Sequence, residues 1–276
     1  MMSPTYSDLF SLKGKVIAIT GGTGVLGSSF VHAVANAGGT VIVMGRNETV
    51  ANEHAEKVKE AGGNAMAVIA DVLCEEDMLA ARDKILQEFG KIDGLVNAAG
   101  GNVPEGVLQN GHDVFDLNID GMKKAMELNV WGTLLPSQVF GAVMAKQGNG
   151  SIVNISSVSA NRALTKVLGY SMGKAAIDCY TNWFAVEVAN RHGDKIRINS
   201  IMPGFFLTEQ NRILLTNADG SLTERGESII AHTPFKRFGT PEELQGALIY
   251  LLSDASKFVT GTQLGVDGGF TKFSGV

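Results

Sequence analysis

The chain has 276 residues, of which 45% are hydrophobic and 18% charged, and its 34 glycines are spread between apolar runs. This composition allows a large buried core and excludes a disordered chain. The formal net charge is -5, without a cluster of Lys or Arg, so the sequence gives no electrostatic basis for nucleic-acid binding.

The first residues lack the pattern of a signal peptide, and no apolar run reaches the length of a membrane span, which predicts a soluble, cytoplasmic protein with no membrane partner. Cys74 and Cys179 are isolated in apolar-rich segments. They predict two reduced, buried thiols, with no disulfide and no metal site.

Short apolar runs alternate with longer amphipathic stretches. The amphipathic stretches, such as residues 49–61 and 75–89, are followed by glycines, as helices often are. The apolar runs do not alternate with polar residues, which is typical of strands covered on both faces. We predict one Rossmann-type, doubly wound α/β domain over residues 1–276, with about seven mainly parallel strands and helices on both faces. The predicted strands are residues 16–20, 41–44, 65–70, 94–97, 151–156, 197–202 and 263–266.

Two segments interrupt this alternation: residues 101–120 after the fourth strand and residues 205–238 after the sixth. In an open parallel sheet, ligands bind beyond the carboxyl ends of the strands, and both segments leave that edge. Long loops in such places are usually functional. We therefore predict a substrate lid at about residues 205–238.

A glycine-rich turn follows the first predicted strand and precedes a helical stretch. Glycines permit a tight turn and close approach to a pyrophosphate, while a helix N-terminus supplies N–H donors. The alternative is a structural turn without a ligand. The predicted cofactor contacts in this turn are Gly21, Thr23, Gly24, Val25, Leu26 and Gly27.

The tip of the second predicted strand bears on the choice of cofactor. NAD sites usually carry a carboxylate there, which accepts a hydrogen bond from the ribose 2′-OH. This chain has Arg46 and Asn47 instead, and an arginine can pair with a 2′-phosphate. The sequence favours NADP(H) over NAD(H), with a solvated loop arginine as the alternative.

Tyr170 and Lys174 are four residues apart, which places them on one face of a helix. A lysine ammonium in this position favours the tyrosine phenolate, as acid–base catalysis near neutral pH requires. Ser157 follows a predicted strand and offers a hydroxyl to a reacting carbonyl oxygen. Tyr-x-x-x-Lys alone is common, so a surface pair is the alternative for an isolated match.

The match is not isolated, because the chain resembles the short-chain dehydrogenase/reductase family over essentially its full length. The family's elements occur in its usual order, although the middle glycine of the turn, Gly24, stands one place early, which puts the local geometry of the turn in doubt. The matching elements are residues 20–27, Asp71, residues 97–100, Asn129, Ser157, Tyr170, Lys174, Pro203, Gly204 and Thr208.

The resemblance implies that Tyr170 is the general acid/base and that Lys174 both tunes Tyr170 and binds the nicotinamide ribose. It implies that Ser157 orients the carbonyl and that Asn129 supports a water-linked proton relay. The further cofactor contacts it implies are Asp71 and Val72 near the adenine, Asn97, Ala98, Ala99 and Gly100 near the adenine ribose, and Pro203, Gly204 and Thr208 near the nicotinamide.

Segments outside the catalytic set resemble the D-mannonate oxidoreductase (fructuronate reductase) branch of the family, namely residues 20–27, 135–141, 203–206, 210–212 and 273–276. This implies a sugar-acid substrate, D-fructuronate reduced reversibly to D-mannonate. The predicted substrate contacts are Arg162, Gln210, Asn211 and Arg212. A reductase for another polar ketone, such as 5-ketogluconate or a 3-oxoacyl thioester, and a catalytically silent NADP-binding sensor are the alternatives. The family resemblance also implies a homotetramer, with helix faces around residues 129–144 and 174–189 packed between subunits.

Overall fold

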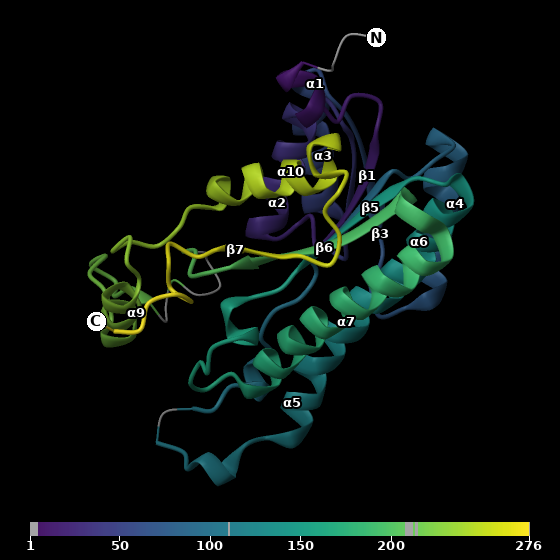
Figure 1. Cartoon of the computed structure of the whole chain (residues 1–276). Helices are drawn as coiled ribbons and strands as arrows, with labels where there is room; N and C mark the ends of the chain where they lie inside the picture. The colour runs from purple at the N-terminus through teal and green to yellow at the C-terminus, as the bar shows by residue number, and fades with distance from the viewer. Residues whose placement is uncertain (1–4, 110, 208–211, 213–214, 276) are drawn as a thin grey trace.

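The computed structural model describes residues 5–109, 111–207, 212 and 215–275 (Figure 1). Seven strands form one sheet: β1 (Val16–Thr20), β2 (Thr40–Gly45), β3 (Asn64–Ile69), β4 (Gly94–Asn97), β5 (Gly150–Ile155), β6 (Ile196–Pro203) and β7 (Gln263–Val266). They lie in the order β3-β2-β1-β4-β5-β6-β7, and every neighbouring pair is parallel. The predicted doubly wound sheet is confirmed, and each predicted strand matches to within one residue at either end.

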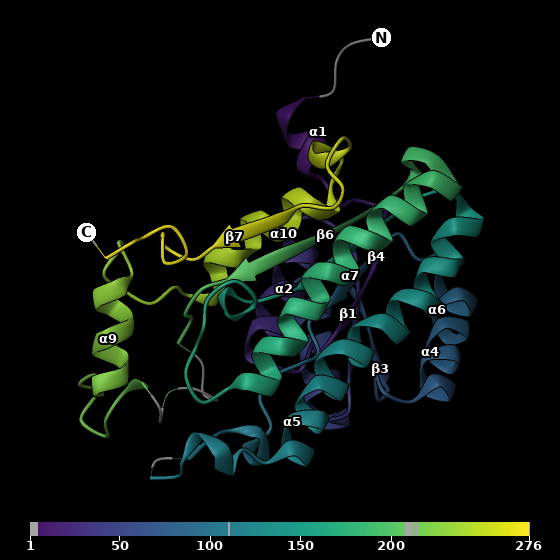
Figure 2. The ribbon, with the colours of Figure 1, turned by 60° about the horizontal axis from the view of Figure 1, so that its bottom comes forward.

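Helices cover both faces of the sheet (Figures 1 and 2). One face carries α2 (Val25–Asn36), α3 (Glu48–Glu60) and α10 (Gln245–Leu252). The other carries α4 (Glu75–Phe89), α6 (Gly132–Gln147) and α7 (Leu168–His192). Of the helices that the structure describes, α1 (Tyr6–Phe10), α5 (Ile119–Met126) and α9 (Glu224–His232) lie outside these layers. In both views α9 lies away from the sheet and close to the C-terminal segment.

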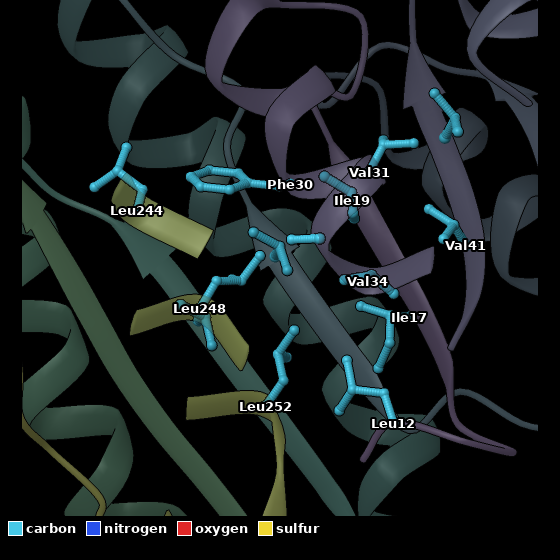
Figure 3. Close-up of a cluster of buried hydrophobic side chains, with 14 of the residues drawn as sticks. Leu12, Ile17, Ile19, Phe30, Val31, Val34, Val41, Leu244, Leu248 and Leu252 are labelled. Carbon is cyan, nitrogen blue, oxygen red and sulfur yellow. The ribbon is translucent and has the colours of Figure 1, made fainter. Parts of the chain in front are cut away.

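Side chains of the central strands are buried on both faces of the sheet. In β1, Ile17 and Ile19 pack in the cluster formed with α2 and α10, where Phe30 and Leu248 also lie (Figure 3). The intervening Val16 and Ala18 belong to the cluster on the opposite face. This burial on both faces explains why the strand sequences are apolar at every position.

Local sequence signals set the ends of the helices. The Asn47 side chain caps α3 by accepting a hydrogen bond from the Val50 amide at 3.1 Å. At its other end α4 stops at Gly90, which has the left-handed φ of 72° that glycine adopts readily. The predicted glycine stop after residue 89 is therefore confirmed.

The chain leaves β1 and β4 toward opposite edges of the sheet, because β1 pairs with β2 on one side and with β4 on the other. Open α/β sheets bind ligands at such a switch point, beyond the carboxyl ends of the strands. The turn after β1 and the segment after β4 therefore meet at the place where a ligand is expected.

Cys179 is exposed on α7, and Cys74 is partly buried, so the prediction of two buried thiols is wrong for Cys179. An apolar-rich helix buries only one of its faces, and the composition of a segment does not tell which. Within the described ranges, no helix combines the length and apolarity of a membrane span. The same ranges hold no group of three or more His, Cys, Asp or Glu side chains suited to a metal ion.

Candidate active site

The glycine-rich turn between β1 and α2 is packed too tightly for side chains at two positions. Gly21 has a φ of 65°, and a Cβ there would lie 2.7 Å from the amide nitrogen of Ala99. A Cβ at Gly27 would collide with the Gly21 carbonyl oxygen. Glycine at these positions lets the turn, the helix and the segment after β4 lie against one another.

Gly24 is the N-cap of α2, and its amide donates to the Gly21 carbonyl at 3.0 Å. Within the part of the chain that the structure describes, no side chain caps this helix. The first-turn amides of Val25, Leu26 and Gly27 are therefore available to an anion, and the positive end of the helix dipole favours one there. Although its middle glycine stands one place early, the turn still opens directly into a helix N-terminus.

The tip of β2 brings together two residues predicted to contact the adenosine end of the cofactor. Arg46 Nη1 lies 3.8 Å from Asp71 Oδ2, and the arginine side chain is 75% exposed. Asp71 also accepts the Leu73 amide at 3.0 Å, which fixes its carboxylate. His54, which the sequence analysis did not single out, lies with Nδ1 3.1 Å from the Gly22 carbonyl and thereby braces the turn from α3.

Asn97 ends β4, but its side chain is buried in the interior of the fold. Its amide group donates to Ser137 Oγ and to Asn154 Oδ1, each at 2.8 Å. Any contact of Asn97 with a ribose is therefore left to its backbone. The next residues continue to the edge of the sheet, where the Ala99 amide donates to Thr20 Oγ1 at 3.2 Å.

Asn129 lies in a π-helical turn, Glu127–Trp131, between α5 and α6. Such turns are rare and often occur at functional sites. The Asn129 amide group donates to the Gly101 carbonyl at 2.8 Å, and its Oδ1 accepts the Gly101 amide at 3.1 Å. A Cβ on Gly100 would lie 2.7 Å from this oxygen and 3.3 Å from Lys174 Nζ. Asn129 thus holds the Gly100–Gly101 backbone beside the lysine, a contact that the sequence did not reveal.

The predicted catalytic residues come together at the carboxyl end of β5. Lys174 is 4% exposed, and its Nζ donates to the Ile155 carbonyl at 2.7 Å while lying 5.5 Å from the centre of the Tyr170 ring. Ser157, just beyond the strand, lies close enough to Tyr170 to act on the pKa of its phenol, and Ser157 Oγ accepts the Ser159 amide at 3.2 Å. A phenol, an ammonium and a hydroxyl thus share one small, largely buried region.

Burial is the main influence on the pKa values of Tyr170 and Lys174. It raises the pKa of the Tyr170 phenol, and the hydrogen bond with Ser157 acts in the opposite direction. It also lowers the pKa of Lys174 to about 8, while the nearby Asp178 carboxylate acts to raise it. A lysine whose pKa is lowered to about 8 next to a tyrosine is suited to proton transfer.

The nicotinamide end of the predicted site lies where β6 and β7 finish. The Gly204 amide donates to the Val266 carbonyl at 2.9 Å, and a Cβ on Gly204 would lie 2.7 Å from Asp267 Cα. Pro203 is the last residue of β6. Thr208 lies outside the described residues.

Val72, predicted near the adenine, is buried against Gly132.

The predicted substrate residues are only partly described, because Gln210 and Asn211 also lie outside the described ranges. The Arg162 guanidinium donates to the Thr271 carbonyl and so joins the loop before α7 to the C-terminal segment. Arg212 is exposed, and its carbonyl accepts the Thr216 amide at 2.7 Å. Arg225 of α9, which the sequence analysis passed over, donates to Thr165 Oγ1 at 2.9 Å and joins α9 to the same loop.

These residues fit a nicotinamide dinucleotide along the carboxyl edge of the sheet. The uncapped start of α2 suits the pyrophosphate, and the absence of side chains at Gly21 and Gly27 gives a backbone cradle. The ammonium of Lys174 has three donors, of which the Ile155 carbonyl takes one, so it can also bind ribose hydroxyls.

A family model described as enoyl-(acyl carrier protein) reductase matches residues 24–271. UxuB, an uncharacterised oxidoreductase of Bacillus subtilis, is 42% identical over 275 residues, which are 96% of this chain and 98% of that protein. The chain belongs to the short-chain dehydrogenase/reductase family. The 7alpha-hydroxysteroid dehydrogenase of Escherichia coli K12 is 32% identical over 263 residues, 95% of this chain and 96% of that protein. The protein is an NAD(P)-dependent oxidoreductase of this family.

Solved structures show the same likeness over the whole fold. A Haemophilus influenzae protein with bound NAD, provisionally assigned as a D-mannonate oxidoreductase, is 39% identical with a TM-score of 0.89, over 99% of this chain and 100% of that one. A gluconate 5-dehydrogenase of Burkholderia cenocepacia, in complex with NADP and tartrate, is 32% identical with a TM-score of 0.84, over 97% and 99% of the two chains. The predicted resemblance of the chain to the D-mannonate oxidoreductase branch is thereby confirmed.

We expect Gly21→Ala to weaken binding of NADH and NADPH at least about tenfold, a change of roughly 1.4 kcal/mol. Its Cβ would press on the backbone of Ala98 and Ala99 and displace the turn. Gly62→Ala is the matched control, because Gly62 also has a positive φ (84°) but no atom within 4 Å of the added Cβ. Fluorescence titration measures both variants. Equal cofactor affinity in Gly21→Ala and Gly62→Ala would contradict the cradle.

Proposed function

We propose that this enzyme reduces the keto group of a sugar acid, D-fructuronate, reversibly to D-mannonate, with NADP(H) preferred to NAD(H). The observation that carries the reaction is the buried Lys174 ammonium beside the Tyr170 phenol, which Ser157 also contacts. The similarity to the Haemophilus influenzae protein over nearly the whole of both chains supports the choice of substrate.

When bound at this site, a reduced nicotinamide would supply the hydride that the carbonyl carbon receives. The Ser157 hydroxyl donates to the carbonyl oxygen and orients it. Tyr170 donates its phenolic proton to that oxygen, and Lys174 stabilises the phenolate that remains. Asn129 keeps the Gly100–Gly101 backbone beside Lys174 and supports the water-linked relay that returns a proton. In the oxidation direction the same phenolate takes the proton of the alcohol.

The carboxylate of a sugar acid needs a cation and its hydroxyls need polar partners. We assign the carboxylate to Arg212 first and to Arg162 second, with Gln210 and Asn211 as partners for hydroxyl groups. Because the Arg162 guanidinium already donates to the Thr271 carbonyl, it has fewer donors left for a substrate. Arg225, joined to the loop before α7, adds a third cation on this side.

The likeness to a gluconate 5-dehydrogenase favours 5-ketogluconate as a second candidate. Both candidates are polyhydroxylated keto acids, so the same hydroxyl and cation contacts serve either. Steady-state rates with D-fructuronate, 5-ketogluconate and an acetoacetyl thioester, each with NADH and NADPH, separate the possibilities. The proposal requires D-fructuronate to give the highest kcat/KM, and a faster thioester would contradict it.

We infer further that the chain forms one domain in which residues 205–238 close over the substrate, and that it assembles as a homotetramer. The helix faces expected between subunits carry the exposed side chains of Trp183 and Val186, and a groove of about 320 Å³ lies between α6 and α7. Exposed aromatic and aliphatic side chains beside such a groove are typical of a subunit contact. Sedimentation equilibrium tests this assembly, and a monomer at micromolar concentration would exclude it.

We expect Tyr170→Phe to lower kcat on the order of a hundredfold to ten-thousandfold, because it removes the transferable proton and keeps the ring. Tyr250→Phe makes the same change away from the catalytic residues, where Tyr250 packs against Phe10, and should leave kcat nearly unchanged. Steady-state kinetics with an unaltered circular dichroism spectrum gives the measurement. A Tyr170→Phe enzyme with wild-type turnover would rule out the acid–base role.

We predict that Arg46→Ala weakens NADPH binding about tenfold to a hundredfold and leaves NADH binding nearly unchanged. Only NADPH carries the 2′-phosphate, and a charge-assisted contact contributes roughly 1.5–3 kcal/mol. Arg82→Ala, which removes a comparable arginine from an ion pair on α4, should change neither affinity. If Arg46→Ala affects both cofactors equally, Arg46 does not read the phosphate.

The carboxylate contact predicts a preference for D-fructuronate over the corresponding neutral keto-hexose. Arg212→Ala should remove most of that preference, lower kcat/KM for the acid, and barely change the rate on the neutral sugar, because only the acid carries the charge. Arg162→Ala, assayed in parallel, should have the smaller effect. An equal loss on both sugars in Arg212→Ala would assign this residue to the lid alone, and a wild-type enzyme without any preference for the acid would contradict the sugar-acid substrate.

A further inference from the structure

Asp178 lies one helical turn beyond Lys174 on α7. Residues four apart on a helix share a face, with Cβ atoms about 5–6 Å apart. Both side chains are buried, Lys174 at 4% and Asp178 at 8% exposure. The Lys174 ammonium reaches the Ile155 carbonyl of β5, and the Asp178 carboxylate reaches Ser200 of β6. A buried carboxylate therefore lies one helical turn from Lys174, on the same side of α7.

The protein around Asp178 gives its carboxylate little other stabilisation. Ser200 Oγ donates to Asp178 Oδ1 across a long 3.5 Å, and Asp178 Oδ2 has no hydrogen-bond partner among the described residues. The buried Ser156 hydroxyl lies near enough to lower the pKa of Asp178, but it makes no hydrogen bond of ordinary geometry. An unpaired buried carboxylate is costly, so its charge requires a nearby cation.

Among the described residues, Lys174 is the cation that shares this buried side of α7 with Asp178. Of the elements packed against this stretch of α7, the 3-10 turn Val158–Ala160 carries no charged residue. Arg197 stands near the start of β6, where it bonds Ser253 and Ser256. The charged residues of α5 and the adjoining turns are exposed to solvent and therefore do not offset the buried charge of Asp178: Glu105, Asp120, Lys123, Lys124 and Glu127. Burial lowers the pKa of Lys174 and raises the pKa of Asp178, and the attraction between the two opposite charges opposes both shifts.

We propose that Asp178 is a positioning residue for the reaction, whose carboxylate keeps Lys174 in its ammonium form beside Tyr170. This inference rests on the proposed roles of Tyr170 and Lys174. Burial disfavours a charged lysine, and an opposite charge one turn away offsets that cost. The ammonium can then stabilise the Tyr170 phenolate at a pH where a lone buried lysine would have lost its proton.

The test is the pH dependence of kcat/KM for ketone reduction in wild type, Asp178→Asn and Asp194→Asn. The substrate is D-fructuronate or, if another is faster, the best ketone of the panel above. Removing the Asp178 charge lowers the pKa of Lys174, so the loss of activity at rising pH should begin about one pH unit lower. At low pH the lysine is protonated in every enzyme, and the rates should converge. Asp194→Asn makes the same substitution at an exposed acid and should follow the wild type.

Ser200→Ala provides a second variant if Asp178→Asn does not fold. It keeps the carboxylate and removes its hydrogen bond, so it should give a smaller displacement in the same direction. A wild-type pH profile in the folded variants would assign Asp178 to packing alone and overturn the proposal. Tyr170→Phe separates this outcome from a wrong function: an active Tyr170→Phe enzyme contradicts the catalytic roles, whereas an inactive one with an unshifted Asp178→Asn profile contradicts only the role of Asp178.

Discussion

The buried ammonium of Lys174 is the interaction on which the rest of the site depends. The Ile155 carbonyl at the end of β5 holds it, and the Tyr170 ring lies 5.5 Å away. A lysine is almost never fully buried unless its ammonium is paired with another group or has a functional role, because burial favours the neutral amine. The surrounding fold supplies a carbonyl at a strand end, a carboxylate one helical turn away and, in the proposed reaction, a tyrosine whose phenolate the ammonium would stabilise.

The same edge of the sheet explains why glycine occurs where it does. The turn after β1, the start of α2 and the Ala98–Ala99 backbone lie so close that Gly21 and Gly27 admit no side chain. Gly100 is equally confined between Asn129 and Lys174. Backbone thus lines the proposed cofactor site on one side and approaches Lys174 on the other. In the proposed function, one short segment, residues 97–101, would join cofactor binding to the acid–base chemistry.

The sequence predicted the strands, the two helical layers and the meeting of Ser157, Tyr170 and Lys174, because apolar periodicity and helical spacing are local properties. It did not predict the orientation of the Asn97 side chain, the clamp of Asn129 on Gly101, or the exposure of Cys179. Those depend on which face of an element meets its neighbour, which only the packed structure determines. The sequence did not single out Asp178 for the same reason. An acidic residue four positions after Lys174 in a helix is usually exposed, and only the structure shows that Asp178 is buried.

A crystal structure of the Tyr170→Phe enzyme with NADP(H) and D-mannonate tests the central claim most directly, because the variant keeps the site and greatly slows turnover. The account predicts the reacting hydroxyl of the sugar acid at about 3 Å from Ser157 Oγ, beside the phenyl ring that replaces the phenol in this variant, with a ribose hydroxyl on Lys174 Nζ. It also predicts that the carboxylate of the sugar acid lies on the side of the lid, residues 205–238. A sugar acid bound with its carboxylate at Ser157, or a ribose out of reach of Lys174, would contradict it.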